Sequence, residues 1–259
     1  MSGGLAVVTG ATAGIGREFA EQLAGRGYDL LLVARDERRL AETAAALATA
    51  HGVEAEAFTA DLSREEHVTR LGDRLATAPR LAMLINNAGF GSRGRLADAD
   101  EERQAAMVRL HALAPLRLTR AALPVLLANR AGAVVNVSSV AGFLYSAGNA
   151  NYCATKAYLT TLSEGLAAEL HGTGVRVQAL CPGFTRTEFH ARIGGAVERH
   201  PEFAWLSARS VVAYSLRCLD RGGPVVCIPG FGYRVLVGVL RLVPRRLIGW
   251  VTRHRYDRV

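Results

Sequence analysis

The chain has 259 residues, of which 50% are hydrophobic and 21% are charged, and its formal net charge at pH 7 is +8. This length favours one large α/β domain over two small ones, and the hydrophobic fraction is enough to bury a sizeable core. The positive charge is concentrated at the end of the chain, because the segment after Gly230 contains seven arginines and one aspartate and carries +6. The rest carries only +2, which argues against a nucleic-acid partner.

The N-terminal segment and the cysteines both indicate a cytoplasmic protein. The chain runs directly into the apolar Leu5–Val8, without the basic and long apolar regions of a signal peptide. We recognise no apolar span of about 18 residues and therefore expect no transmembrane helix. The spacing of the cysteines fits neither a metal site nor a disulfide, so we expect reduced thiols and no bound metal. They are Cys153, Cys181, Cys218 and Cys227.

Short apolar runs alternate with longer amphipathic runs along the chain. The apolar runs predict seven strands, at Leu5–Thr9, Asp29–Ala34, Val53–Ala60, Leu81–Asn86, Ala133–Val137, Val175–Cys181 and Pro224–Ile228. The amphipathic runs predict helices near 14–25, 36–50, 63–77, 101–129, 152–171 and 207–221. Strands without polar alternation are buried on both faces, as in a parallel sheet. The alternation of strands and helices therefore predicts one α/β domain with a doubly wound, seven-stranded parallel sheet.

A glycine-rich loop follows the first predicted strand. It reads GATAGIG, with Gly10, Gly14 and Gly16 around Thr12 and Ile15, and a predicted helix begins directly after it. Glycines let the backbone approach a pyrophosphate, which binds at the positive end of the helix. A tight turn without a ligand is the alternative. The position between a strand and a helix favours dinucleotide binding.

The end of the second strand bears on the choice of dinucleotide. An NAD site would have a carboxylate here for the ribose hydroxyls. This chain has Ala34 followed by Arg35, and an arginine can pair with the 2′-phosphate of NADP. Arg17, just after the glycine-rich loop, would add to this charge. We therefore expect NADP rather than NAD, and the alternative is that Arg35 is a solvated arginine.

Three more strand ends carry candidate cofactor contacts. After the third strand, Asp61 and its neighbour Leu62 are placed to meet the adenine. After the fourth strand, the sequence NNAG puts small residues against the cofactor ribose, namely Asn87, Ala88 and Gly89. After the sixth strand, Pro182–Gly183 turns the chain over the nicotinamide, and Thr185 follows. Each of these is ordinary turn chemistry when taken alone, but their order along the chain favours a cofactor site.

The stretch 138–156 contains three residues that can converge on one reacting atom. Tyr152 and Lys156 are four residues apart and share one face of a predicted helix, while Ser139 follows the fifth strand. A phenol is a poor acid at neutral pH unless a cation stabilises its phenolate. One positive charge at about 4 Å, at an effective dielectric near 20, supplies roughly 4 kcal/mol. That would bring a tyrosine towards a working pH for acid–base catalysis.

Lys156 is the only lysine in a chain with 31 lysines and arginines. A compact ammonium and a guanidinium fork are not interchangeable, so a single lysine at this position indicates a specific role. The alternative is a surface lysine on an ordinary helix. A YxxxK pattern alone is weak, but with Ser139 at this spacing it favours a catalytic set.

From residue 5 to about 230 the sequence resembles the short-chain dehydrogenase/reductase family. The family motif TGxxxGxG appears as Thr9–Gly16, and NNAG as Asn86–Gly89; the catalytic serine, the YxxxK pair and the PG turn appear at Ser139, Tyr152–Lys156 and Pro182–Gly183. The resemblance implies a single-domain Rossmann fold and NAD(P)-dependent interconversion of an alcohol and a carbonyl. It also implies that the tyrosine transfers the proton, the lysine binds the ribose and lowers the tyrosine pKa, and the serine orients the carbonyl.

One position departs from the family pattern. The family usually has an asparagine in the fourth helix that holds a water in a proton relay, and the corresponding residue here is His111. A neutral imidazole can also bind a water, so an altered relay is one interpretation. The other is a core histidine whose hydrogen bonds are satisfied by the protein.

The span 184–206 is predicted to form a substrate lid over the nicotinamide. Its large apolar side chains suggest an apolar substrate, although such residues also serve a small core of the lid itself. They are Phe184, Phe189, Ile193, Phe203 and Trp205.

The segment 231–259 is predicted to be a C-terminal extension of a catalytic domain formed by residues 1–230. Its second half, after Pro244, predicts a basic amphipathic helix, with Leu247, Ile248, Trp250 and Val251 opposite Arg246, Gly249 and Arg253. Such a helix can lie on an anionic membrane. Alternatively, its apolar side packs on the body of the protein or on a second subunit of a homodimer or homotetramer.

These observations predict an NADP-dependent oxidoreductase that acts on a small-molecule carbonyl or alcohol of apolar character, with Tyr152 as the general acid–base. An alternative is an NADP-binding sensor or regulatory protein with little turnover, in which His111 marks a lost relay. A third interpretation is a peripheral membrane protein that uses an enzyme fold as a scaffold.

Overall fold

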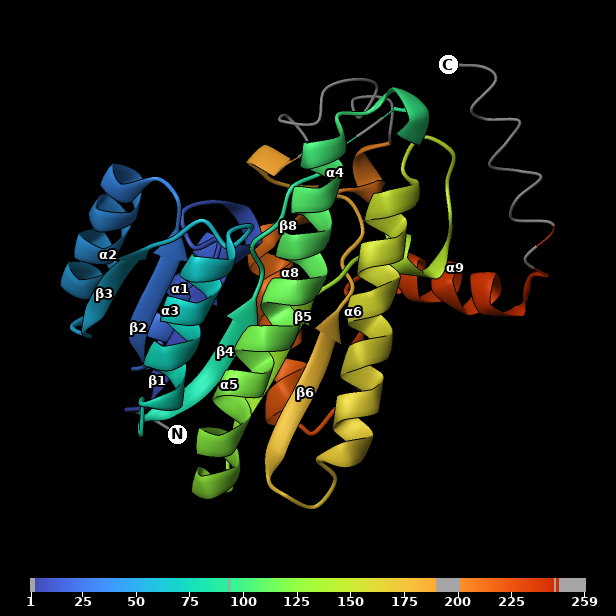
Figure 1. Cartoon of the computed structure of the whole chain (residues 1–259). Coiled ribbons are helices and arrows are strands. Elements are labelled where there is room, and N and C mark those ends of the chain that lie inside the picture. The colour runs from blue at the N-terminus through green and yellow to red at the C-terminus, as the bar shows by residue number, and fades with distance from the viewer. Residues whose placement is uncertain (1–2, 93, 190–200, 245, 247–259) are drawn as a thin grey trace.

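The computed structural model describes residues 3–92, 94–189, 201–244 and 246. Seven strands form one parallel sheet in the order β3-β2-β1-β4-β5-β6-β9, with helices on both faces (Figure 1). The strands are β1 Leu5–Thr9, β2 Asp29–Ala34, β3 Ala55–Thr59, β4 Leu81–Asn86, β5 Gly132–Val137, β6 Val175–Leu180 and β9 Val226–Cys227. The prediction of a doubly wound, seven-stranded parallel sheet is therefore confirmed.

The helices form two layers around the sheet. They are α1 Gly14–Ala24, α2 Glu37–His51, α3 Glu65–Ala76, α4 Glu101–Val108, α5 Ala114–Asn129, α6 Ala150–Glu169, α8 Ala208–Asp220 and α9 Phe231–Leu242. Residues of α1, α2 and α8 share one hydrophobic core with the sheet, and residues of α3, α5 and α6 share the other. Both cores are continuous across several strands, which accounts for a single domain in this part of the chain.

The strands supply both cores because successive side chains point to opposite faces of the sheet. In β1, Ala6 and Val8 belong to the core on the α1 side, whereas Val7 belongs to the core on the α3 side. All three are fully buried. This two-sided burial explains why the strands read as unbroken apolar runs.

The long helix predicted near 101–129 is interrupted in the middle. α4 and α5 are joined by one π-helical segment, η2 Arg109–Leu113, in which the Ala114 N–H donates to the Arg109 carbonyl five residues earlier. Pro115 has no N–H, so the His111 carbonyl has no helical donor four residues ahead. A proline at the start of α5 is therefore one physical reason for the irregular turn around His111.

Strand ends and short helices differ from the predicted bounds. β3 and β9 are shorter than predicted, and β9 is an edge strand that pairs only with β6, where Pro224 cannot donate to the ladder. Two further strands, β7 Thr185–Arg186 and β8 Leu206–Ser207, pair with each other outside the main sheet. Three short 3₁₀ helices complete the described elements: η1 Leu96–Asp98, η3 Val140–Phe143 and η5 Glu202–Ala204.

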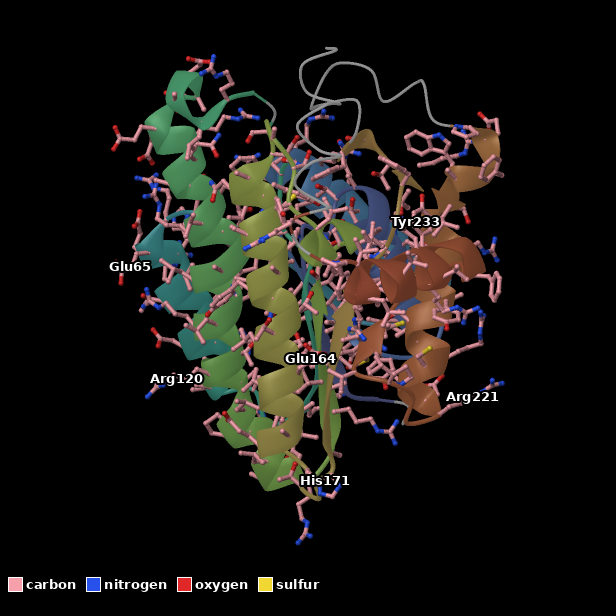
Figure 2. All side chains as sticks on the ribbon, turned by 90° about the vertical axis from the view of Figure 1, so that its right-hand side faces the viewer. Glu65, Arg120, Glu164, His171, Arg221 and Tyr233 are labelled. Carbon is pink, nitrogen blue, oxygen red and sulfur yellow. The ribbon has the colours of Figure 1, made fainter. Side chains whose placement is uncertain are left out.

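The C-terminal helix α9 packs on the body of the protein rather than standing apart from it. Its residue Val237 is buried, and the helix contacts η3. Figure 2 shows Tyr233 towards the carboxyl ends of the strands, whereas His171 lies at the opposite end of α6. Most of the predicted amphipathic helix after Pro244 falls on residues 245 and 247–259, which lie outside the described residues.

One described helical segment is long and apolar enough to cross a membrane by length and composition alone. It spans Glu101–Asn129, whereas the sequence analysis expected no such span. In its apolar window 44% of the residues are buried in the protein, and α5 packs against α3. We therefore interpret this segment as a core helix.

Candidate active site

The predicted cofactor motifs meet where β1 and β4 lie side by side. The chain moves outward from β1 to β3 and then returns to β4 beside β1, so a crevice opens at the carboxyl ends of these strands. The glycine-rich loop leaves β1 there, and the NNAG sequence leaves β4. The fold therefore brings together two motifs that are about 75 residues apart in the chain.

Hydrogen bonds hold the glycine-rich loop against its neighbours. The N–H groups of Gly10 and Ala11 donate to the Val33 carbonyl at 2.8 and 3.2 Å. The Asn87 side chain donates to the Thr9 carbonyl at 2.9 Å. A Cβ on Gly16 would overlap the carbonyl oxygen of Gly10, so only glycine allows helix α1 to begin this close to the strand. The loop therefore offers the bare backbone surface that a pyrophosphate needs.

Thr9 is a residue of this site that the sequence analysis did not single out. Its hydroxyl donates to the Ile85 carbonyl at 3.1 Å and accepts from the N–H groups of Asn87 and Ala88 at 2.9 and 3.0 Å. One buried hydroxyl thus joins the glycine-rich loop to the NNAG sequence. The only sequence signal was its place as the first residue of TGxxxGxG.

The residues predicted for the adenosine end also lie together. Arg35 is exposed at the end of β2, and its charge acts on Asp61 after β3. Burial opposes ionisation of Asp61, but two hydrogen bonds from Ser63 and the nearby positive charge lower its pKa overall. The Asp36 carboxylate instead accepts from the Arg39 N–H at 3.0 Å and caps α2. The end of β2 therefore presents a cation beside a carboxylate that is committed to capping.

Ser139, Tyr152 and Lys156 converge as predicted. Tyr152 lies in the first turn of α6 and forms a hydrogen bond with Ser139, whose hydroxyl also accepts from the Ala141 N–H at 3.1 Å. The Lys156 ammonium lies 5.6 Å from the centroid of the Tyr152 ring and donates to the Val137 carbonyl at 2.8 Å. The end of β5 and the start of α6 thus place an alcohol, a phenol and a cation in one cluster.

The electrostatics of this cluster differ from the sequence-based expectation. Part of the Tyr152 side chain is accessible, yet desolvation of the phenolate raises its pKa, and the hydrogen bond with Ser139 only partly opposes this. Burial also lowers the pKa of Lys156 to about 8. The lysine was expected to lower the tyrosine pKa, whereas here burial raises it and the opposing contribution comes from Ser139. The resting tyrosine is therefore a neutral phenol at neutral pH.

His111 is a buried histidine with both ring nitrogens engaged by the protein. The Phe90 N–H donates to Nε2 at 3.0 Å, so the neutral ring carries its proton on Nδ1, which lies 3.1 Å from the Thr155 hydroxyl. That hydroxyl in turn donates to the Tyr152 carbonyl at 2.9 Å. Burial and the charge of Lys156 hold the pKa of His111 well below its usual value.

The two interpretations of His111 can now be compared. Because each ring nitrogen already has a protein partner, the ring is not available to hold a relay water in this arrangement. The geometry favours the satisfied core histidine. The ring also lies edge-on to Tyr152, with centroids 5.8 Å apart. His111 therefore links the loop after β4 to the first turn of α6, through Thr155, which no sequence pattern marked.

The turn after β6 carries the remaining predicted cofactor residues. The Pro182 carbonyl accepts from the Val140 N–H at 3.1 Å, and the Thr185 hydroxyl donates to the Gly183 carbonyl at 3.0 Å. The turn is thereby tied to the segment that follows Ser139. This contact places the PG turn beside the cluster of Ser139, Tyr152 and Lys156.

The first residues of the predicted lid lie over the site. The Phe189 ring is 6.0 Å from the Tyr152 ring, and Thr187 packs against Gly14 in the glycine-rich loop. Arg39 forms an ion pair with Glu188, which connects α2 to the first part of the predicted lid. The part of the predicted lid formed by residues 190–200, including Ile193, lies outside the described residues.

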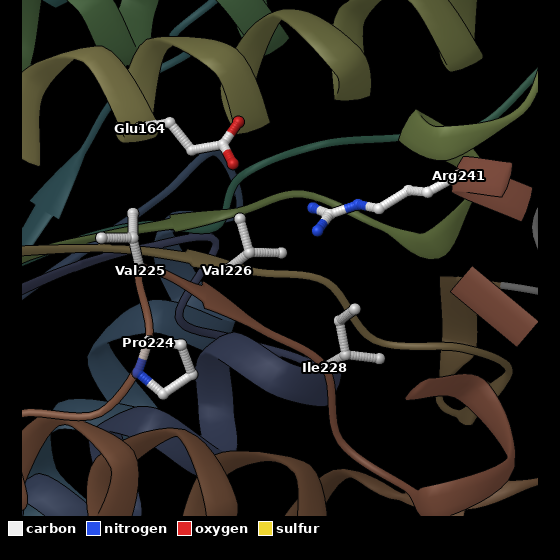
Figure 3. Close-up of a pocket in the computed structure, with 6 residues that line it drawn as sticks. All are labelled: Glu164, Pro224, Val225, Val226, Ile228 and Arg241. Carbon is white, nitrogen blue, oxygen red and sulfur yellow. The ribbon is translucent and has the colours of Figure 1, made fainter. Parts of the chain in front are cut away.

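A separate pocket of about 400 Å³ lies between α6, the edge strand β9 and α9 (Figure 3). None of the predicted catalytic or cofactor residues lines it. The lining residues are Glu164, Pro224, Val225, Val226, Ile228 and Arg241.

Comparison with known proteins agrees with the site. A family model of the short chain dehydrogenases matches residues 4–197. A very-long-chain 3-oxoacyl-CoA reductase from Coprinopsis cinerea is 38% identical over 180 residues, which cover 68% of this chain and 53% of that protein. The chain thus aligns with only about half the length of this fungal relative.

Solved structures show the same likeness. A short-chain dehydrogenase from Sphingobium yanoikuyae, in complex with NADPH, has a TM-score of 0.84 and 38% identity, over 92% of this chain and 94% of that one. A short-chain dehydrogenase/reductase from Burkholderia phymatum, in complex with NAD, has a TM-score of 0.79 and 28% identity, over 91% and 92%.

The fold and the site define a dinucleotide-binding α/β protein with a serine, a tyrosine and a lysine at the end of its sheet. With the family match, this chain belongs to the short-chain dehydrogenase/reductase family of oxidoreductases.

Replacing His111 by alanine should destabilise the protein. The change leaves the half-buried Phe90 N–H without its acceptor and removes the donor to Thr155, which should cost about 1–3 kcal/mol in the free energy of unfolding. Denaturant unfolding followed by circular dichroism measures the loss. His171→Ala, at an exposed position beyond α6, is the matched control. If both variants unfold at the midpoint of the parent, the described hydrogen bonds of His111 are wrong.

Proposed function

We propose that the protein is an NADP-dependent oxidoreductase that transfers a hydride between the nicotinamide and the carbonyl or alcohol of an apolar substrate. The observation that carries the proposal is the cluster of Ser139, Tyr152 and Lys156 beside the glycine-rich loop. The Tyr152–Ser139 hydrogen bond and the position of Lys156 by the tyrosine ring support an acid–base role.

When bound, NADPH supplies the hydride, and the residues of the chain handle the proton and the orientation. The Ser139 hydroxyl is placed to hydrogen-bond the substrate carbonyl together with Tyr152. The Tyr152 hydroxyl donates its proton to the carbonyl oxygen as negative charge develops there. The Lys156 ammonium would bind the ribose and stabilise the phenolate that remains.

We further propose that the site is set for reduction at neutral pH. Reduction needs a protonated tyrosine and a charged lysine. Burial raises the pKa of Tyr152, so the phenol keeps its proton, and burial lowers the pKa of Lys156 to about 8. Below pH 8 both groups are in the required form. As the pH rises through about 8, the lysine loses its charge and reduction should slow.

Replacing Tyr152 by phenylalanine keeps the ring and removes the proton donor. Turnover of one accepted carbonyl substrate should fall by roughly 10²–10⁴-fold, the usual contribution of an acid–base group. The dissociation constant of NADPH should stay near that of the parent. Tyr158→Phe, on the same helix at a position 37% exposed, is the control. The assay follows NADPH absorbance over roughly two pH units on either side of the Lys156 pKa of about 8.

The outcome separates the enzyme from the sensor. Turnover of Tyr152→Phe at the rate of the parent would show that the proton-transfer assignment is wrong. A parent that binds NADPH tightly but reduces none of a broad carbonyl panel would favour the NADP-binding sensor or regulatory protein. A parent rate of reduction that stays flat between pH 7 and pH 9 would contradict the role given to the Lys156 charge, because its pKa is about 8.

The preference for NADP is proposed from the end of β2. Arg35 is exposed there, and no carboxylate occupies the position of Ala34. The Sphingobium relative was solved with NADPH, whereas the Burkholderia relative was solved with NAD, so relatives use either form. The arginine therefore supports NADP in this chain. Arg17 lies near the loop and forms an ion pair with Glu21 at 3.0 Å, so its charge is partly committed.

Arg35→Ala should abolish most of the cofactor preference. A charge-assisted contact with the 2′-phosphate of about 1–3 kcal/mol predicts that NADPH binds roughly 5- to 150-fold more tightly than NADH in the parent. Titration of cofactor fluorescence measures both constants. Arg38→Ala removes an exposed arginine that pairs with Glu42 and is the matched control. Equal NADPH and NADH affinities in the parent would overturn the assignment.

An apolar substrate is proposed from the residues that surround the cluster. Phe189 lies beside Tyr152, and Phe184 and Trp205 lie together at the base of the lid with ring centroids 5.6 Å apart. The fungal relative bears the name of a very-long-chain 3-oxoacyl-CoA reductase, which supports a long or bulky apolar carbonyl compound. A panel of aliphatic, aromatic and steroid-like ketones tests this substrate class.

We also propose that this cytoplasmic protein contacts anionic membranes at its surface through α9. The inner face of the helix is covered by the protein, but an outer stripe of apolar residues is exposed. Its members, at spacings of three or four residues, are Phe231, Val235, Val239 and Leu242. The arginine-rich chain after Pro244 follows directly, which adds the positive charge that attracts anionic lipids.

Introducing charge on this stripe should release the protein from vesicles. The parent should sediment with phosphatidylserine vesicles at low salt, and the double variant Val235→Glu/Val239→Glu should not, while its melting temperature stays near that of the parent. These positions are 50% and 51% exposed, so the changes should be tolerated by the fold. The parent protein could instead fail to bind vesicles and form a homodimer or homotetramer that dissociates in the charged variant. That result would show that a second copy of the chain covers this face.

A further inference from the structure

Tyr233 of α9 touches both ends of the predicted lid. Its hydroxyl donates to the Ala204 carbonyl at 2.6 Å and accepts from the Phe184 N–H at 3.0 Å. Phe184 directly follows the PG turn, and Ala204 ends the 3₁₀ helix η5. Two positions 20 residues apart in the chain are thus bridged by one side chain from a third segment.

The ring of Tyr233 also lies directly on the PG turn. A Cβ on Gly183 would overlap three carbons of this ring, so only glycine permits the contact. Gly230, just before α9, has a φ of 86° and lies close to the same ring. The tight fit fixes where the ring can sit, and therefore where the hydroxyl points.

The base of the lid is short and depends on few backbone bonds. β7 and β8 have two residues each, and the Leu206 N–H donates to the Phe184 carbonyl at 2.8 Å. Arg186 forms an ion pair with Glu202 and lies over the Trp205 ring at 5.8 Å. Because the β7–β8 ribbon has so few backbone hydrogen bonds of its own, the two hydrogen bonds of the Tyr233 hydroxyl are a large part of what holds it in place.

The helix that carries Tyr233 is itself well anchored. Val237 is buried, and the Arg234 guanidinium donates to the Tyr214 hydroxyl of α8 at 2.8 Å. Arg241 lies 5.2 Å from the ring centroid of Phe143 in η3, the short helix that Ser139 caps. Burial raises the pKa of Tyr233, so its hydroxyl keeps the proton that it donates. α9 therefore joins the body of the protein to the lid base as a fixed support.

We propose that Tyr233 is a positioning residue that holds the PG turn and the described ends of the predicted lid, next to β7 and β8, in the positions that the proposed cofactor and substrate site requires. This rests on the proposed function, because the turn and the lid matter only if a nicotinamide cofactor binds beside them. It also makes α9 a part of the working site and not a separate appendage. Tyr233 touches neither substrate nor cofactor in this role.

The variant Tyr233→Phe keeps the ring on Gly183 and removes the two hydrogen bonds. The dissociation constant of NADPH and the KM of one accepted carbonyl should each rise about 3- to 30-fold, with a smaller change in kcat, because the lost bonds order the site before the chemistry. Tyr214→Phe is the matched control. It removes a hydroxyl that contacts the neighbouring Arg234 but touches neither Phe184 nor Ala204.

The fluorescence of Trp205 provides a measurement that would not change if Tyr233 only stabilised the fold. With Trp250→Phe as the background, Trp205 is the remaining tryptophan of the chain. Acrylamide quenching of its fluorescence should increase in Tyr233→Phe and stay unchanged in Tyr214→Phe, at a temperature where both variants are folded. An equal loss of thermal stability in the two variants, without a change in quenching, KM or NADPH affinity, would overturn the proposal.

The proposed function and the positioning role of Tyr233 can be tested separately. If the parent does not bind NADPH, the proposed function is wrong. If the parent binds and oxidises NADPH but Tyr233→Phe matches it in NADPH affinity, KM and Trp205 quenching, the function stands and the positioning role is wrong.

Discussion

The arrangement of the site depends on a reciprocal pair of buried hydrogen bonds between β5 and α6. The Lys156 ammonium donates to the Val137 carbonyl at 2.8 Å, and the Ser138 hydroxyl donates to the Lys156 carbonyl at 2.7 Å. A buried ammonium without an acceptor would be costly, so these bonds fix the helix relative to the strand. Tyr152, one turn before Lys156, is thereby brought to Ser139 at the strand end. Ser139, Tyr152 and Lys156 converge because the buried Lys156 ammonium has its hydrogen-bond acceptor at the end of β5.

A second constraint comes from the irregular turn between α4 and α5. Pro115 cannot donate to the His111 carbonyl, and the π-helical segment places the His111 ring between the loop after β4 and α6. The family usually has an asparagine at this place. Here an imidazole spans the gap with two hydrogen bonds. Its neutrality matters, because a second cation in this buried space would oppose the charge of Lys156.

Burial acts on the pKa values of Tyr152 and Lys156 in opposite directions. It raises the pKa of Tyr152 and lowers that of Lys156, since in each case the charged form loses water. A phenol that keeps its proton beside a lysine that can still be charged is a suitable pair for giving a proton to a carbonyl. Helix α9, which lies in the predicted C-terminal extension, contacts both the lid base and η3. The residues of the candidate site and those that support them thus come from distant parts of the described chain.

The sequence by itself determined the sheet and the glycine-rich loop, and it marked Ser139, Tyr152 and Lys156 as candidates for catalysis. Apolar runs and motif spacing are local, and a parallel sheet buried on both faces leaves few other arrangements. Only the tertiary structure decided the direction of the Tyr152 pKa, the hydrogen bonds of His111 and the contact of Tyr233 with the PG turn. Each of these depends on groups far apart in the chain: Gly183 and Tyr233 are separated by 50 residues, and no local pattern encodes their contact. Burial and distant hydrogen bonds arise only when the chain has folded, which is why the motifs named the residues but not their environment.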